Sequence, residues 1–164
     1  MKFPPRPLSL RIAAAGLLSA SLSAAAQTPP YGLSINIEQA KQAMVAAEAE
    51  ARKNNWQVVI SIVDSGGHLV MLQRLEAQDA IVDISIGKAR TAVSFHRPTE
   101  ALEDSMAAGA CTLRILAVHD AMPLQGGLPI VVDDKIIGGI GVSGEQASQD
   151  EMVAKAGVDT LAAK

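Results

Sequence analysis

The spacing of apolar residues divides the chain into segments of helical and extended pattern. After Asn36, an apolar stripe recurs at helical spacing, and its members are Ile37, Ala40, Met44, Ala47 and Ala51. Gln39 stands three residues after Asn36, which is the spacing of a capping box, so a helix is expected to begin there and to end near Asn54. Two apolar runs, residues 56–64 and 69–74, flank the turn sequence 65–68 and predict a β-hairpin.

The middle of the chain combines helical segments with a short apolar run. Residues 79–95 suit a broad-faced helix that stops before Pro98, and Thr99 is the expected N-cap of a further helix that runs to about Ala108. The run 116–122 predicts a short strand, which is followed by the proline-bracketed loop 123–129.

The last third predicts a second hairpin and a final helix. Residues 130–132 and 136–142 flank Asp133, Asp134 and Lys135, and Ser148 stands three residues before Glu151 in capping-box spacing. The resulting order, α-β-β-α-α-β-β-β-α, favours an antiparallel sheet with helices packed on it. The expected class is therefore an α+β layered fold.

The N-terminus has the pattern of an export signal. Basic residues at Lys2, Arg6 and Arg11 precede a short apolar stretch, and small residues then lead to Ala26. This order predicts a signal peptide over residues 1–26, cleaved near Ala26/Gln27, and hence a periplasmic or secreted protein. Residues 27–34 read as an extended tether and residues 35–164 as a single domain.

Charge and composition exclude several classes of partner. Cleavage after residue 26 would leave 138 of the 164 residues, with 11 of the 14 basic residues against 17 acidic ones, a formal charge of −6. Net negative charge opposes binding to nucleic acids and anionic membranes, and no apolar run predicts a stable membrane anchor. The lone Cys111 allows no internal disulfide.

Glycine clusters mark two candidate sites. The loop containing Gly126 and Gly127, and the sequence Ser143-Gly144-Glu145 before the final helix, could bind an anion or another ligand. Tight turns and a helix start capped by Ser148 explain the same residues without a ligand. Glycines inside a strand usually mark a bulge or the close approach of another backbone, and for those in the predicted strand 136–142 we expect a ligand or a neighbouring subunit to lie against the strand.

Six segments in order resemble the GlcG/HbpS family, which includes the C-terminal domain of PduO-type proteins. They are VDSGGHLV at 63–70, KARTA at 88–92, FHRPT at 95–99, GGLPI at 126–130, IGGIGVSG at 137–144 and QDE at 149–151. The resemblance implies a profilin-like fold with a five-stranded antiparallel sheet flanked by helices. It also implies a higher homo-oligomer and association with haem, which is bound or degraded by members of this family.

Haem requires an apolar slot, an axial donor and cations for its propionates. His68, His96 and His119 are the available imidazoles, and none is three or four residues from another, as a helical metal pair would require. His96 is the leading metal ligand, because Pro98 pins its segment and Arg97 adjoins it; His68 is second. Arg97 and Lys88 could meet the propionates, aided by backbone amides beside Thr99.

Two further hypotheses stay open at this point. The first is an enzyme, a hydrolase or tautomerase, acting on a small acidic metabolite that Arg97, His96 or Glu145 would hold. The second is a non-catalytic sensor or partner-binding module. The leading hypothesis is non-covalent haem binding by an exported homo-oligomer, for scavenging, sensing or degradation.

Overall fold

The computed structural model describes residues 28–162, apart from the side chains of residues 110–112. The predicted signal peptide lies outside this range. The central sheet contains β1 (Val59–Asp64), β2 (Leu69–Arg74), β3 (Gly127–Val132) and β4 (Lys135–Ser143), in the order β2-β1-β4-β3. All neighbouring strands are antiparallel, so both predicted hairpins are confirmed.

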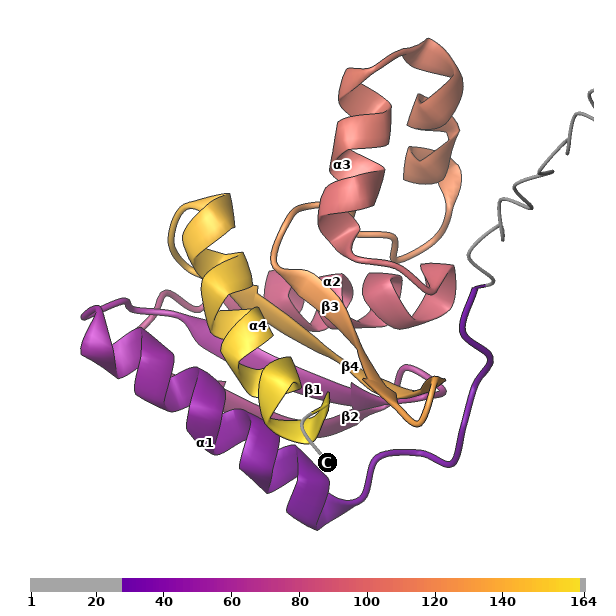
Figure 1. Ribbon diagram of the computed structural model, residues 1–164. Helices are drawn as coiled ribbons and strands as arrows, with labels where there is room; N and C mark the ends of the chain where they lie inside the picture. Colours follow the sequence, from indigo (N-terminus) through magenta and orange to yellow (C-terminus); the bar gives the residue numbers. More distant parts are fainter. Residues whose placement is uncertain (1–27, 163–164) are drawn as a thin grey trace, which may run out of the picture.

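Helices cover both faces of this sheet (Figure 1). On one face lie α1 (Ile37–Lys53) and α4 (Ala147–Ala162), which pack against each other; on the other face lies α2 (Ile81–Phe95). The larger core lies under α1 and α4 and includes Ile60, Ile62, Ile140 and Val142. The smaller one lies under α2 and consists of Val63, Ala89, Val93 and Ile136. The expected α+β layered fold is therefore present.

The glycines of β4 explain how closely α2 approaches the sheet. A Cβ atom at Gly141 would collide with the carbonyl oxygen of Ser85, and one at Gly139 would lie 2.8 Å from the carbonyl oxygen of Ala89. The group that lies against this strand is thus the backbone of α2 in the same chain. The expectation of a ligand or a neighbouring subunit there is corrected accordingly.

Helix starts only partly follow the sequence prediction. Asn36 and Gln39 form the predicted capping box of α1. Thr99, by contrast, is the first residue of α3 (Thr99–Ala107) rather than its cap, because its buried hydroxyl donates to the carbonyl oxygen of Leu124 at 2.6 Å. Ser148 does not cap α4 either, since that helix already begins at Ala147.

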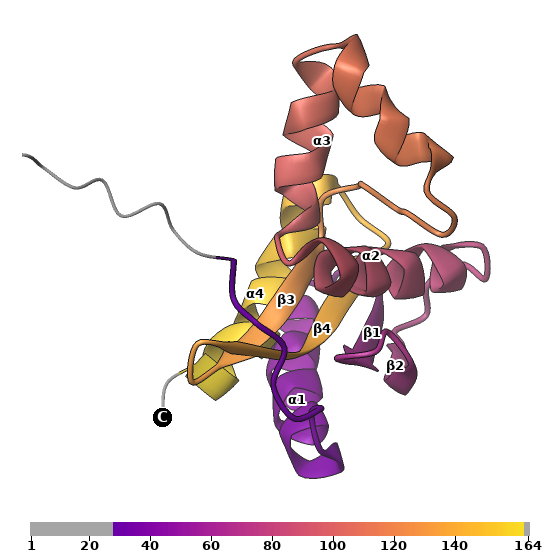
Figure 2. The same cartoon turned by 90° about the vertical axis from the view of Figure 1, so that its right-hand side faces the viewer.

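The segment between α3 and β3 differs most from the prediction. Residues 110–117 form the 3₁₀ helix η1 (Ala110–Ala117), and the chain then turns at Val118–Ala121. Together with α3 these residues form an arm that stands away from the sheet (Figure 2). The strand predicted at 116–122 is therefore wrong, and the described residues contain four strands instead of five. A short apolar run does not by itself distinguish a strand from a helical turn.

The predicted tether is extended, and it is bonded to the sheet. The N–H of Gly32 donates to the carbonyl oxygen of Ile136 at 2.8 Å, and the N–H of Ile136 donates to the carbonyl oxygen of Pro30 at 2.9 Å. The hydroxyl of Tyr31 donates to the carbonyl oxygen of Val93 near the end of α2. Between residues 28 and 162, no helix is both long and apolar enough to cross a bilayer.

Candidate functional site

A polar groove lies where α2, the β1–β2 turn and the end of the arm meet. It has a volume of about 420 Å³. The β1–β2 turn contributes His68, α2 contributes Arg90 and Phe95, and the turn after η1 contributes Val118 and His119. The antiparallel β1–β2 pairing and the arm thus bring together residues that are far apart in the sequence.

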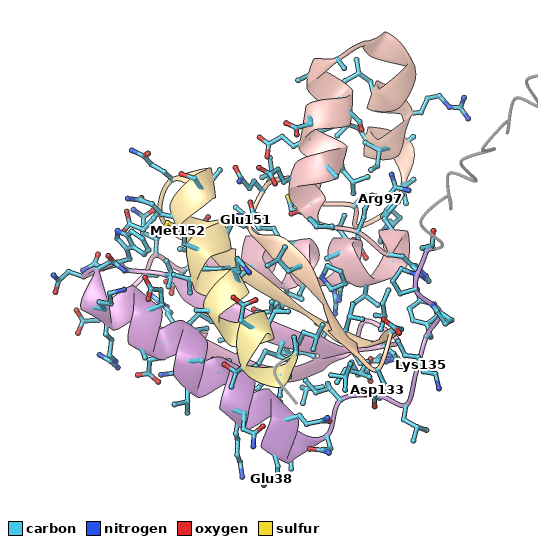
Figure 3. The ribbon with its side chains drawn as sticks, viewed as in Figure 1. Glu38, Arg97, Asp133, Lys135, Glu151 and Met152 are labelled. Atoms are coloured by element: carbon cyan, nitrogen blue, oxygen red, sulfur yellow. The ribbon has the colours of Figure 1, made fainter. Side chains whose placement is uncertain are left out.

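An apolar slot of about 370 Å³ adjoins this groove, since Phe95 and Val118 line both. The slot lies between the end of α2 and the arm, and Figure 3 shows Arg97 at the base of the arm. Its remaining lining residues are Leu102, Ser105, Arg114 and Ile115. We call the groove and the slot together the arm groove.

Three arginines give the arm groove a positive charge. The Nε–H of Arg90 donates to the carbonyl oxygen of Gly67 at 3.0 Å, and that of Arg97 to the carbonyl oxygen of Phe95 at 3.3 Å. Within the described part of the chain, neither of them nor Arg114 forms an ion pair with a carboxylate. Although the chain is acidic overall, these arginines make the groove locally favourable for carboxylates.

Two histidines of the polar groove each lie beside an aspartate. The Nδ1 atom of His68 is 3.3 Å from Oδ1 of Asp64, and the Nδ1 atom of His119 is 2.9 Å from Oδ2 of Asp120. Desolvation opposes ionisation of Asp64, but the N–H groups of His68 and Gly66 outweigh it and lower the pKa of this carboxyl. Both imidazoles are largely exposed and available to a ligand.

Lys88 is not available to a ligand in this structure. Its ammonium group is buried, donating to Oδ2 of Asp150 at 2.9 Å and to the carbonyl oxygen of Val142 at 2.8 Å. Burial raises the pKa of the Asp150 carboxyl, while Lys88 and the N–H of Glu145 oppose this effect. The lysine thus joins α2 to α4 through the core, away from the arm groove.

The two glycine-containing loops close around this ion pair. A Cβ at Gly126 would lie 3.1 Å from Nζ of Lys88, and the N–H of Gly127 donates to the buried hydroxyl of Thr99 at 2.9 Å. At the start of α4, the N–H of Glu145 donates to Oδ1 of Asp150 at 3.1 Å, so a side chain of the protein occupies the position expected for an anion. Ser143 is buried, and a Cβ atom added at the neighbouring Gly144 would collide with the backbone of residues 57 and 58.

His96 lies at the C-terminal end of α2 and faces the tether. Its backbone is left-handed, its Nδ1 is 2.9 Å from the carbonyl oxygen of Pro29, and its ring packs on that of Tyr31 with centroids 4.3 Å apart. His96 lines neither part of the arm groove. The structure therefore brings His68, Arg97 and His119 to the arm groove and places His96, Lys88 and Thr99 elsewhere.

Arg90 and Arg114 line the arm groove but were not among the binding residues predicted from the sequence. Arg90 follows Lys88 in the KARTA segment, but helical spacing alone does not tell which of the two cations is buried. Arg114 reaches the slot only because its segment forms η1 within the arm. No cluster of three or more His, Cys, Asp or Glu side chains able to hold a metal ion occurs among the described residues.

An apolar slot bordered by a few charged groups has the character of a small-molecule site. Residues 35–159 match the family model "Haem degrading protein HbpS-like", so the chain belongs to the HbpS-like family. The predicted family is thereby confirmed.

Relatives and solved structures agree with this assignment. The chain is 42% identical over 108 residues to Protein GlcG of Escherichia coli K12, covering 65% of this chain and 79% of GlcG. Its fold is similar to that of Klebsiella pneumoniae protein ORFY, with a TM-score of 0.77, 30% identity and coverage of 84% and 97% of the two chains. It is also similar to PduOC in a crystal structure with haem, with a TM-score of 0.72, 27% identity and coverage of 78% and 95%.

Proposed function

We propose that this chain binds haem non-covalently in the arm groove. The observation that carries this proposal is the apolar slot between α2 and the arm, bordered by Arg97 and Arg114. The haem complex of the PduOC relative and the family to which the chain belongs support it. Scavenging, sensing or degradation of haem would each use such a site.

The residues present fit the requirements of haem. Phe95, Leu102, Ile115 and Val118 offer an apolar surface, on which a porphyrin can be removed from water. The free guanidinium N–H groups of Arg97 and Arg114 suit the two propionates, because arginine binds carboxylates with charge-assisted hydrogen bonds. Haem would supply an iron that accepts an axial donor and changes oxidation state.

Replacement of both slot arginines should weaken haem binding. Titration of the purified protein with haemin is expected to give a saturable Soret shift, and Arg97→Ala with Arg114→Ala should raise the Kd by at least about tenfold, since hydrogen bonds to charged groups are worth roughly 1.5–3 kcal/mol each. Arg52→Ala is the matched control, because Arg52 lies at the end of α1 and lines a different pocket. An unsaturable shift in the parent would refute haem binding, and an unchanged Kd in the double variant would refute this site.

A second candidate function is catalysis on a small carboxylate. The polar groove favours it, because Arg90 could hold the carboxylate beside His68 and His119, two imidazoles suited to proton transfer. The set of Arg97, His96 and Glu145 expected from the sequence is less suited to catalysis. Glu145 accepts from the N–H of Gln57 before β1, whereas the ring of His96 packs on Tyr31, which is bridged to Ile136 at the opposite end of β4. Turnover of a small carboxylate that Arg90→Ala abolishes would favour the enzyme; binding of haemin without turnover favours a carrier or sensor.

We further propose that the protein is exported and forms a homo-oligomer. The signal-like pattern ending at Ala26 supports export. The arm supports assembly, since it exposes large apolar side chains such as Leu113 and Leu116, which a second copy would cover.

Two measurements test these proposals. The N-terminus of the purified product is expected at or near Gln27, and light scattering is expected to give a multiple of about 14 kDa, the mass of ~138 residues. An intact Met1 or a monomeric mass would contradict the respective proposal.

A further inference from the structure

The turn Val118–Ala121 places the imidazole of His119 in the polar groove, next to the residue that this groove shares with the apolar slot. Val118 lines both the polar groove and the apolar slot, and His119 follows it directly. The N–H of Ala121 donates to the carbonyl oxygen of Val118 at 3.2 Å and closes the turn. The N–H of Met122 donates to the hydroxyl of Thr91 at 2.7 Å, which fixes the turn to α2.

Asp120 holds the His119 ring in a state suited to ligation. With Oδ2 of Asp120 2.9 Å from Nδ1 of His119, the proton of a neutral ring is favoured on Nδ1, and the lone pair is left on Nε2. A carboxylate behind a ligating histidine fixes its tautomer and the orientation of its ring.

The other two histidines are less suited to this role. The Oδ1 atom of Asp64, which lies 3.3 Å from the ring of His68, already accepts the N–H groups of Gly66 and His68 at 2.8 and 2.9 Å, so this carboxylate shapes the turn. His68 and His119 both line the polar groove, but only His119 directly follows Val118, which lines the groove and the slot alike. His96 is engaged by Pro29 and Tyr31 and lines neither part.

We propose that His119 is the axial ligand of haem in the arm groove and that Asp120 positions its imidazole. This assignment rests on the proposed haem-binding function. It replaces His96, the leading candidate from the sequence, by a histidine that lines the polar groove with Arg90 and directly follows Val118, the residue shared with the apolar slot. Arg97 and Arg114 would hold the propionates, while the turn after η1 presents the donor to the iron.

Haemin titration with two independent readouts tests the assignment. Quenching of the fluorescence of Trp56, the single tryptophan, reports binding, and the visible and electron paramagnetic resonance spectra report the axial ligand. We expect His119→Ala to lose the imidazole-ligated spectrum and to regain it on addition of free imidazole. Haemin should still quench Trp56 in this variant, with a higher Kd than in the parent. Asp120→Asn should raise the Kd by about tenfold while imidazole ligation is kept.

His96→Ala is the matched control, since His96 lies outside the arm groove, and it should retain the spectrum of the parent. His68→Ala tests the alternative ligand within the groove and should keep imidazole ligation. An unchanged spectrum in His119→Ala, or loss of imidazole ligation in either of the other two variants with retention in His119→Ala, would overturn the assignment while leaving haem binding intact. Absence of saturable quenching in the parent would instead remove the proposed function itself. Since the side chain of His119 is 93% exposed, its replacement is expected to leave the fold unchanged, which circular dichroism checks.

Discussion

Replacing Lys88 by methionine is expected to lower the free energy of unfolding by about 3–5 kcal/mol, because it leaves a buried carboxylate without its partner. Lys88 and Asp150 have side-chain exposures of only 4% and 3%, and their atoms are 2.9 Å apart. Urea denaturation of the Lys88→Met variant measures the loss. The double variant Lys88→Met with Asp150→Leu should recover part of it, since no buried charge then remains.

The destabilisation by Lys88→Met should depend on pH in a defined direction. Burial already raises the pKa of Asp150, and removal of the ammonium group takes away an interaction that opposes this rise. A carboxyl whose pKa is higher in the folded than in the unfolded state binds protons more readily when folded, so the deficit should shrink as the pH falls through the folded-state pKa. A deficit independent of pH would contradict an uncompensated carboxylate.

The exposed pair Lys155 and Asp159 on α4 provides the matched control. Its atoms are 2.8 Å apart, as close as those of the buried pair, but its side chains are 65% and 58% exposed. Exposed pairs contribute little, so Lys155→Met should change the free energy of unfolding by no more than about 0.5 kcal/mol. Similar losses for both lysines would refute the importance of burial.

Replacing Gly141 by alanine is expected to cost about 3 kcal/mol, the upper end of the range for overpacking a core. The added Cβ would collide with the carbonyl oxygen of Ser85 and lie 2.5 Å from the N of Ala89. Both atoms belong to the backbone of α2, which cannot move aside like a flexible side chain. The loss is measured by thermal and urea denaturation.

Gly66→Ala is the control for this substitution. A Cβ at Gly66 would meet atoms of the exposed side chain of His68, which can rotate away, in a turn at the surface. We expect a change within about 0.5 kcal/mol. If both alanine variants lost the same stability, the cost would arise from the loss of glycine itself and not from contact between β4 and α2.

The arm shows why local patterns failed between α3 and β3. Ile115, Leu116 and Val118 have the composition of a strand, but in the structure they belong to η1 and to the turn that follows it. A segment forms a strand only where a free sheet edge can pair with its backbone N–H and C=O groups. The apolar composition of the segment does not show whether such an edge is near. The local pattern also failed at Thr99. Its hydroxyl donates to the carbonyl oxygen of Leu124 and accepts from the N–H of Gly127, so it does not cap α3.

The amino-acid sequence alone was enough to predict the family, the α+β class, the two hairpins and the capped start of α1. These features follow from local signals: apolar periodicity, the capping box of Asn36 and Gln39, and motifs such as VDSGGHLV, each contained in a few adjacent residues. The tertiary structure alone decided which polar residues meet. Lys88 is paired with Asp150, which is 62 residues away, and His119 reaches the groove through the arm. Such partners depend on how α2, α4 and the arm pack, which no local spacing of residues encodes.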